Sequence, residues 1–272
     1  MNGKEFLDSL KKGNRLYGTT IISSAPQWPS VVKAAGVDFI FVDVEHIPID
    51  RVTLSQMCNL YKANGLPPLV RIPAPDPFEV CKVLDGGAAG ILAPYIESAE
   101  QVRELVGAAK FRPLKGKRLE KVLREEDVLE GELKDYLQNR NKDNFFMINI
   151  ESMPGYENLD DILAVSGLDG IIIGPHDLSV SLGMPEQYDQ PRFEEIVGDI
   201  IRRVRGKGLA AGIHFSEGPE LQIRWAKEGA NIILHSSDIT LFQQRLTADI
   251  GAIRSAMGEE VKTIKKERDL QI

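Results

Sequence analysis

The feature that most constrains the fold of this chain is an eightfold alternation of short apolar runs with helix-like segments. The apolar runs predict strands at residues 18–24, 39–46, 67–73, 90–96, 145–152, 170–176, 209–215 and 231–238. Nearly continuous apolar strands are typical of parallel sheets buried on both faces. A helix-like segment follows each run, and the last one extends from about Ile239 to Lys262. Eight such units predict a (β/α)8 TIM barrel, which we take as a single domain over residues 1–272.

Residues that commonly start and stop helices support this division. Asp50, Asp76 and Ser98 stand at predicted helix starts, and Gly65 and Gly208 stand at predicted helix ends. A doubly wound open sheet is the main alternative, but that fold usually carries a G-x-G-x-x-G turn after its first strand. The stretch GTTIISSAPQWP contains no such turn, so the barrel is favoured.

One segment, residues 112–143, interrupts the alternation between the fourth helix and the fifth strand. It is heavily charged, and we expect it to be partly helical. Two interpretations stay open: a solvated excursion, or a flap or subunit contact.

The bulk properties exclude several classes of function. The 272 residues carry a formal net charge of −7, with a pI near 5.3. This balance argues against nucleic-acid binding, which needs a basic surface. No apolar run approaches the roughly 20 residues that span a bilayer, and the polar N-terminus has no apolar signal region. We therefore expect a cytoplasmic protein whose Cys58 and Cys81 are buried free thiols.

All four histidines lie at the end of an apolar run. They are His46, His176, His214 and His235. In a parallel barrel the strand ends meet at the C-terminal rim, where barrels of this type place their active sites. We therefore expect the four imidazoles to gather at that rim.

Two acidic residues end neighbouring predicted strands. Glu151 ends the fifth strand, and Asp177 follows the sixth. Adjacent strands lie about 4.8 Å apart, so the two carboxylates could share one cation. Their oxygens suit a hard divalent ion such as Mg²⁺ or Mn²⁺, with Co²⁺ as a further candidate. Either acid could instead cap the helix that follows it.

Arg71, in the run LVRIP, and His46, in DVEH, are the other candidates for chemistry. A buried guanidinium needs a partner, so Arg71 could pair with Asp43 or Glu45 in a purely structural role. It could also hold an oxyanion beside the cation. His46 could act as a base if a carboxylate, either Asp43 or Asp85, fixes its tautomer.

Several stretches, in this order and spacing, resemble the HpcH/HpaI aldolase family over about residues 18–250: FVDVEH, LVRIP, VLDGGAAGILAP, INIES and IIIGPHDLSVSLG. The resemblance implies a (β/α)8 barrel assembled as a homo-oligomer, a trimer of dimers that exchange the last helix. It also implies a metal-dependent aldolase that cleaves a 4-hydroxy-2-oxo acid to pyruvate and an aldehyde.

The resemblance further implies roles for individual residues. Glu151 and Asp177 would hold the divalent metal, and Arg71 would contact the 2-oxo group and its enolate. His46 would transfer protons, supported by Asp43 and Asp85.

The turn IIIGPHDLS opens a helix, and its backbone N–H groups suit a carboxylate. By resemblance the backbone at His176 and Asp177 would bind the pyruvate carboxylate, and we expect Gly174 and Pro175 of the same turn to contact the substrate as well. The chain also departs from the family pattern. His176 replaces a small residue, His214 replaces a small aliphatic residue of the pocket wall, Asn149 replaces a glutamine, and residues 87–90 read GAAG instead of GAQG.

Three functions follow from these features. The first is the aldolase. The second keeps the metal enolate but changes the reaction, for example to oxaloacetate decarboxylation. The third is a catalytically retired binding or assembly protein, and the retained set of Glu151, Asp177, Arg71 and His46 argues against it.

Overall fold

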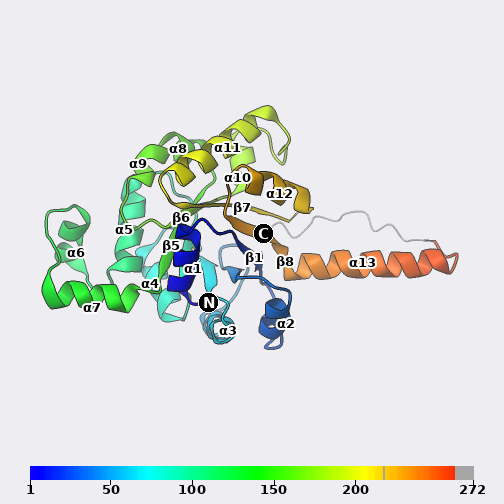
Figure 1. Ribbon diagram of the computed structural model, residues 1–272, viewed down its shortest axis with the longest axis horizontal. Coiled ribbons are helices and arrows are strands. Elements are labelled where there is room, and N and C mark those ends of the chain that lie inside the picture. Colours follow the sequence, from blue (N-terminus) through cyan, green and yellow to red (C-terminus); the bar gives the residue numbers. More distant parts are fainter. Residues whose placement is uncertain (217, 261–272) are drawn as a thin grey trace.

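The chain forms a closed barrel of eight parallel strands with helices packed around it (Figure 1). The structure is a computed structural model that describes residues 1–216 and 218–260. Each strand pairs with the next one along the chain, and β8 closes on β1. The strands are β1 (Leu16–Thr20), β2 (Phe39–Asp43), β3 (Pro68–Arg71), β4 (Gly90–Ala93), β5 (Phe145–Ile150), β6 (Gly170–Ile173), β7 (Ala210–Phe215) and β8 (Ile232–Ser237). The predicted (β/α)8 fold is confirmed.

Most of the helices surround the barrel. They are α1 (Gly3–Lys11), α2 (Trp28–Ala34), α3 (Arg51–Ala63), α4 (Pro77–Asp85), α5 (Ala99–Lys110), α6 (Gly116–Leu123), α7 (Gly131–Asn141), α8 (Met153–Glu157), α9 (Leu159–Leu163), α10 (Pro175–Ser181), α11 (Pro191–Gly206), α12 (Pro219–Lys227) and α13 (Asp238–Ala256). Helix α1 instead covers the N-terminal end of the barrel. There Phe6 stacks on Phe145 with ring centroids 4.4 Å apart and meets Phe39 edge-on at 5.4 Å.

Side chains on the strands alternate between two apolar cores. Those that face into the barrel, such as Phe41, Leu69 and Met147, form one cluster. Those that face outward pack against the helices in a second and larger cluster. Toward the C-terminal ends of the strands the inward positions become polar: Thr20, Asp43, Arg71, Asn149 and His214. The alternation thus places a layer of polar side chains above an apolar barrel interior.

The predicted helix boundaries are confirmed where the sequence carries clear caps. The side chains of Asp50, Asp76 and Ser98 each accept a hydrogen bond from a backbone N–H of the first helical turn. Gly65 and Gly208 follow helix ends with positive φ angles of 71° and 76°. Glycine adopts this left-handed conformation without a steric cost.

Most strands end earlier than the apolar runs predict, whereas β7 ends at Phe215 as predicted. Strand β2 ends at Asp43, three residues before His46, and β6 ends at Ile173. The reason at β6 is the sequence Gly174-Pro175, because proline is well suited to the first turn of a helix and starts α10 there. His176 and Asp177 therefore lie in the first turn of a short helix rather than at a strand end.

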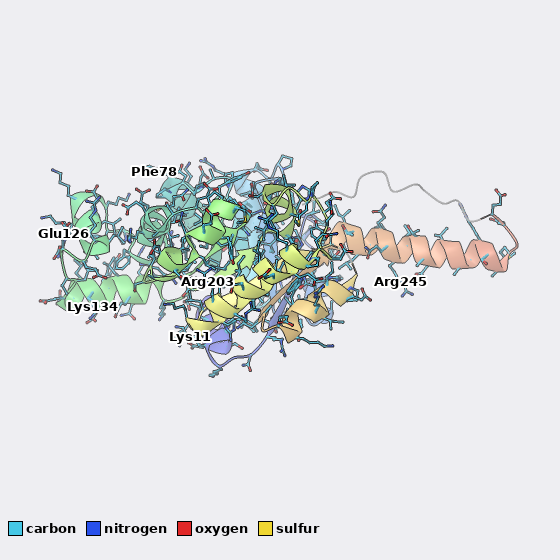
Figure 2. The ribbon with its side chains drawn as sticks, turned by 90° about the horizontal axis from the view of Figure 1, so that it is seen from above. Lys11, Phe78, Glu126, Lys134, Arg203 and Arg245 are labelled. Carbon is cyan, nitrogen blue, oxygen red and sulfur yellow. The ribbon has the colours of Figure 1, made fainter. Side chains whose placement is uncertain are left out.

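The charged segment 112–143 contains α6 and α7, which project from one side of the barrel (Figure 1). Glu126 and Lys134 mark this projection in Figure 2. The side chains of Leu119 and Leu123 contact the Gly107 region of α5, which anchors α6 to the barrel. The prediction of partial helix is confirmed.

Helix α13 extends away from the opposite side of the barrel (Figures 1 and 2). Its large apolar side chains are exposed: Ile239, Leu241, Phe242, Leu246, Ile250, Ile253 and Met257. The predicted long helix is confirmed, but it ends at Ala256, before the predicted end at Lys262, which lies outside the described residues. No helix in the described ranges is long and apolar enough to cross a membrane.

Both cysteines are free thiols, as expected. Cys58 is buried, and burial raises its pKa to about 12. Cys81 is only half-buried, so the expectation of burial holds for Cys58 alone.

Candidate active site

A buried ion pair between Arg71 and Asp43 forms the centre of the rim. The two residues are direct neighbours in the register of β3 and β2. Arg71 Nε lies 2.9 Å from Asp43 Oδ1, and Arg71 Nη2 lies 2.5 Å from Asp43 Oδ2. Asp43 is fully buried and Arg71 nearly so. Such a bidentate contact fixes the guanidinium, as a buried charge requires.

His46 completes a triad with this pair. Its Nδ1 lies 3.1 Å from Asp43 Oδ2 and 2.7 Å from Arg71 Nη2. The hydrogen bond to Asp43 raises the pKa of His46, although burial and the charge of Arg71 oppose the effect. The other ring nitrogen, Nε2, points away from the pair, and 44% of the side chain is exposed. The predicted contact between His46 and Asp43 is present.

Glu45 is a third acid in contact with Arg71, with its Oε2 3.1 Å from Arg71 Nε. Asp43, Glu45 and His46 together could reach one metal ion. The guanidinium of Arg71, however, already contacts all three residues and supplies the positive charge. We therefore regard this cluster as an arginine site.

Glu151 and Asp177 are the two carboxylates that the sequence predicts as ligands of a divalent cation. Glu151 is 6% exposed and directly follows β5, and Asp177 lies in the first turn of α10. Burial raises the pKa of Glu151 to about 7. The backbone hydrogen bond from Tyr95 opposes this shift, and the negative charges of Asp177 and Glu45 add to it. A buried carboxylate beside a second carboxylate is stabilised by a cation, so this donor set fits Mg²⁺ or Mn²⁺.

Gly174 provides the space for Glu151. A Cβ atom at Gly174 would lie 2.9 Å from Glu151 Oε2 and 3.0 Å from its Cβ. Any side chain at position 174 would therefore displace this carboxylate. The φ angle of Gly174 is −87°, so the requirement for glycine here is one of space.

The structure does not bring Asp85 to His46. Asp85 is the last residue of α4, and the helix runs antiparallel to the strands, so its end lies near the N-terminal end of the barrel. Its carboxylate is bonded to Arg112 at 2.9 Å and is 68% exposed. The prediction that Asp85 supports His46 is wrong within a single chain, and Asp43 alone makes that contact.

His214 faces the inside of the barrel at the end of β7. Its Nε2 lies 3.3 Å from Thr20 Oγ1, and the backbone of Ser236 also hydrogen-bonds the ring. Burial and the charge of Arg71 lower the pKa of His214 to about 4. Its ring lies 6.0 Å from that of Phe41, over which Arg71 is placed at 5.7 Å. His214 is therefore a neutral group beneath the arginine site.

The other two histidines do not join this group. His176 lies in α10, with Nδ1 3.7 Å from Glu186 Oε1. His235 follows the inward-facing Leu234, so it faces outward, within range of the charge of Glu220 on α12. The four imidazoles thus do not form one group. His46 and His214 lie near Arg71, while His176 is on the rim but directed toward Glu186, and His235 faces outward.

Asn149 lies two residues before Glu151 and also faces inward. Its Nδ2 donates to the carbonyl of Ile172 at 2.8 Å. Its Oδ1 is buried and has no hydrogen-bond partner within the described residues. The side chain therefore offers one free acceptor to the polar layer.

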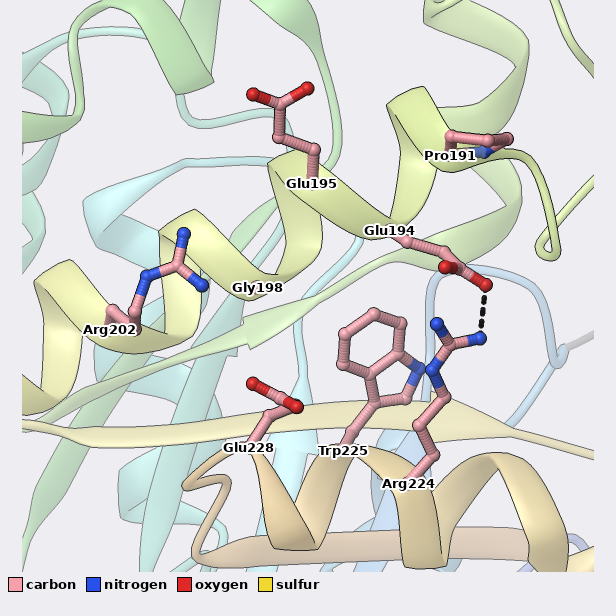
Figure 3. A pocket seen from close by; sticks show the side chains of 8 residues that line it. All are labelled: Pro191, Glu194, Glu195, Gly198, Arg202, Arg224, Trp225 and Glu228. Atoms are coloured by element: carbon pink, nitrogen blue, oxygen red, sulfur yellow. Dashed lines mark hydrogen bonds and ion pairs between the residues drawn. The ribbon is translucent and has the colours of Figure 1, made fainter.

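A recess lies outside the barrel, between α11 and α12, away from the rim (Figure 3). It has a volume of about 310 Å³ and is lined by Glu194, Arg224 and Trp225 among others. Arg224 pairs with Glu194 and lies over the ring of Trp225 at 5.0 Å. The guanidinium of Arg224 is thus already paired with Glu194, and none of the predicted site residues lines this recess.

The sequence interpretation missed Tyr95 and underrated Glu45. The backbone N–H of Tyr95 donates to Glu151 Oε1 at 2.6 Å, and its phenol hydrogen-bonds Glu45. Glu45 could have been found, since it lies between Asp43 and His46 in the motif DVEH. Tyr95 carries no comparable signal, because its contacts depend on the path of the loop after β4.

The rim thus combines two carboxylates suited to a divalent cation with a buried arginine and a histidine. This is the arrangement of a barrel lyase that stabilises an enolate. Residues 21–245 match the family model of the HpcH/HpaI aldolase/citrate lyase family. The chain belongs to this family, whose members act through metal-dependent enolate chemistry, and the match indicates a carbon–carbon lyase.

Curated relatives and a solved structure agree with this assignment. The chain is 31% identical to a hydroxypyruvate/pyruvate aldolase of Roseovarius nubinhibens, over 88% of this chain and 92% of the relative. It is 30% identical to a 2-keto-3-deoxy-L-rhamnonate aldolase of Salmonella paratyphi B, over 96% of each chain. The crystal structure of an HpcH/HpaI aldolase from Desulfitobacterium hafniense is similar, with a TM-score of 0.78 and 30% identity. That match covers 91% of this chain and 95% of the other.

Proposed function

We propose that the protein is an aldolase that cleaves a 4-hydroxy-2-oxo acid to pyruvate and an aldehyde. The observation that carries the proposal is the position of Glu151 and Asp177 on the same rim as the fixed guanidinium of Arg71. The names of the relatives, which are aldolases of pyruvate and of 2-keto acids, support the substrate class.

Glu151 and Asp177 would hold the divalent cation, with Mg²⁺ or Mn²⁺ as the first candidates and Co²⁺ as a third. A cation bound there supplies Lewis-acid withdrawal of charge from the 2-oxo group. Arg71 would donate an N–H to the 2-oxo oxygen and stabilise the negative charge that develops as the C3–C4 bond breaks. Asp43 keeps the guanidinium in place for this role.

His46 would move the proton. In the tautomer whose Nδ1–H donates to Asp43, and not the one whose Nδ1 accepts from Arg71, Nε2 is free to accept the proton of the C4 hydroxyl while the electron pair of the C3–C4 bond moves to the 2-oxo group. The aldehyde leaves, and His46 returns the proton to C3 to give pyruvate. No atom or electron is left over in this sequence.

The first turn of α10 would bind the substrate carboxylate. This assignment covers Gly174, Pro175, His176 and Asp177, and His214 would line the pocket beneath the aldehyde half of the substrate. The support is their position beside Glu151 and Arg71, respectively.

We also propose that the protein is a cytoplasmic homo-oligomer. The support for an oligomer is the set of exposed apolar side chains on helix α13, because such a surface commonly marks a protein contact. Figure 1 shows that this helix projects from the barrel. A trimer of dimers that exchange this helix is the assembly we expect from the family resemblance.

The test is exchange of the pyruvate methyl protons with D₂O, followed by a screen of aldehydes in the reverse, carbon–carbon bond-forming direction. Exchange should require a divalent cation and stop after chelation. Condensation with an aldehyde would support the aldolase. Exchange without condensation, together with CO₂ release from oxaloacetate, would support a decarboxylase instead. A protein that exchanges no protons with any of the three cations would refute the proposal.

A further inference from the structure

Tyr95 connects the two halves of the site through two different groups. Its backbone N–H donates to Glu151 Oε1 at 2.6 Å. Its phenol hydrogen-bonds Glu45, whose Oε2 lies 3.1 Å from Arg71 Nε. One residue after β4 thus contacts both the proposed metal ligand on β5 and the acid that pairs with the arginine.

The backbone of Tyr95 is in a conformation that tyrosine rarely adopts. Its φ angle is 56°, in the left-handed region that favours glycine. Strained positions of this kind persist where surrounding contacts enforce them, and they cluster at functional sites. At Tyr95 the left-handed turn is what directs the N–H toward Glu151 while the side chain reaches Glu45.

The surroundings of the phenol place it inside the site. The hydrogen bond to Glu45, partial burial, and the negative charges of Glu45, Glu151 and Asp177 raise the pKa of Tyr95 to about 12. The phenol therefore stays neutral and remains a hydrogen-bond donor. More than half of the residue is nevertheless exposed, so apolar packing does not explain its position.

We propose that Tyr95 is a positioning residue for the enolate reaction, and that its phenol holds Glu45 so that Glu45 and Asp43 together orient Arg71. This inference rests on the proposed function. Without the phenol, the Glu45 carboxylate keeps its contact with Arg71 but loses its second partner, so the orientation of Arg71 depends mainly on Asp43. The backbone N–H, which the side chain does not affect, continues to hold Glu151.

The first experiment compares wild type with Tyr95→Phe, which removes only the hydroxyl. The maximum rate of pyruvate proton exchange with Mn²⁺ should fall about 10-fold, as for loss of a hydrogen bond to a charged group. The pyruvate KM and the Mn²⁺ Kd, the latter measured by calorimetry, should stay within about twofold, because the phenol acts on the arginine and leaves binding intact. Tyr136→Phe on α7 is the matched control, since Tyr136 is similarly exposed and distant from the rim, and it should change nothing.

The second experiment compares Tyr95→Gly with Tyr95→Ala. Both remove the phenol and should lose exchange to the same degree, while both keep the backbone N–H and Mn²⁺ binding. Glycine relieves the left-handed strain and alanine does not, so the ratio of folded to unfolded protein should be about 5- to 30-fold higher for Tyr95→Gly. Equal stability of the two variants would contradict a strained backbone at this position.

The outcomes separate the two proposals. A wild type that exchanges pyruvate protons, with a Tyr95→Phe variant that does so equally fast, would overturn the role of Tyr95 and leave the proposed function intact. Parallel losses of exchange, Mn²⁺ affinity and thermal stability in Tyr95→Phe would also overturn it, since they would indicate a merely structural residue. A wild type without exchange would refute the proposed function and this role with it.

Discussion

The buried pair of Asp43 and Arg71 makes a quantitative prediction about stability. Replacing Asp43 with Asn keeps the shape of the side chain and removes its charge. Asp43 is fully buried and Arg71 is 8% exposed, so the guanidinium would be left without its bidentate counter-ion. Removing one partner of a buried ion pair costs about 3–5 kcal/mol. Asparagine still offers one acceptor, and Glu45 remains near Arg71, so we expect the lower end of this range.

A loss of about 3 kcal/mol corresponds to a decrease in Tm of roughly 6–12 °C for a domain of this size. The assay is thermal unfolding of wild type and Asp43→Asn at pH 7, followed by circular dichroism. Asp8→Asn is the matched control, because its ion pair with Lys4 is exposed and should contribute no resolvable change. An Asp43→Asn variant that melts with the wild type would show that Arg71 does not depend on this carboxylate, and the reasoning would fail.

Because Asp43 titrates, the difference in Tm between wild type and Asp43→Asn should depend on pH. Burial alone would raise the pKa of Asp43, but the hydrogen bonds from His46 and Arg71 outweigh it and hold this pKa well below its ordinary value of 3.8. The stabilisation is therefore complete above the unfolded-state pKa and is lost as the pH falls toward the folded-state pKa. Because Asp43 also raises the pKa of His46, the gap in Tm should widen slightly as the pH falls from 7 to about 6. It should then stay constant to about pH 5 and narrow below about pH 4.

Four further outcomes test the site. Arg71→Lys should lower the rate of pyruvate proton exchange on the order of 10²-fold, because a lysine cannot reproduce the fixed guanidinium, and an unchanged rate would exclude Arg71 from the enolate. His46→Ala should slow carbon–carbon cleavage roughly 10²- to 10⁴-fold while Mn²⁺ binding by calorimetry is retained. The affinity for Mn²⁺ should weaken about tenfold per pH unit as the pH falls below the Glu151 pKa of about 7, because the proton competes with the cation. An affinity that stays constant between pH 5 and 8 would contradict Glu151 as a ligand. His214→Leu should reduce the preference for a hydroxylated over an alkyl aldehyde by about tenfold, measured as the ratio of the two kcat/KM values.

The barrel and its central residues could be predicted because they follow from strand periodicity. Once eight apolar runs are taken as parallel strands, their C-terminal ends must meet, and Asp43, Arg71 and Glu151 come together there. The hydrogen bond between His46 and Asp43 follows from a separation of three residues across one turn. These parts of the site depend on local sequence and on the closure of the barrel.

The rest depends on features that a strand pattern does not contain. Asp85 was placed wrongly because a complete helix separates it from β3 and carries it to the opposite end of the barrel. His235 was placed wrongly because side chains on a strand alternate, and the inward position belongs to Leu234. Tyr95 acts through its backbone N–H and a left-handed φ angle, which residue type alone does not reveal.

The contact between Gly174 and Glu151 limits how this chain can change over evolution. An alanine at position 174 would overlap Glu151 Oε2, so that single substitution removes the proposed ligand whatever the rest of the sequence. An aspartate at position 151 would relieve only the contact with Oε2, because the Cβ of residue 151 would still lie 3.0 Å from the added methyl group. A shorter acid therefore does not compensate, and position 174 should remain glycine among functional descendants. By contrast, Gly206 has open space around its Cβ position and does not have a positive φ angle, so it is free to vary independently.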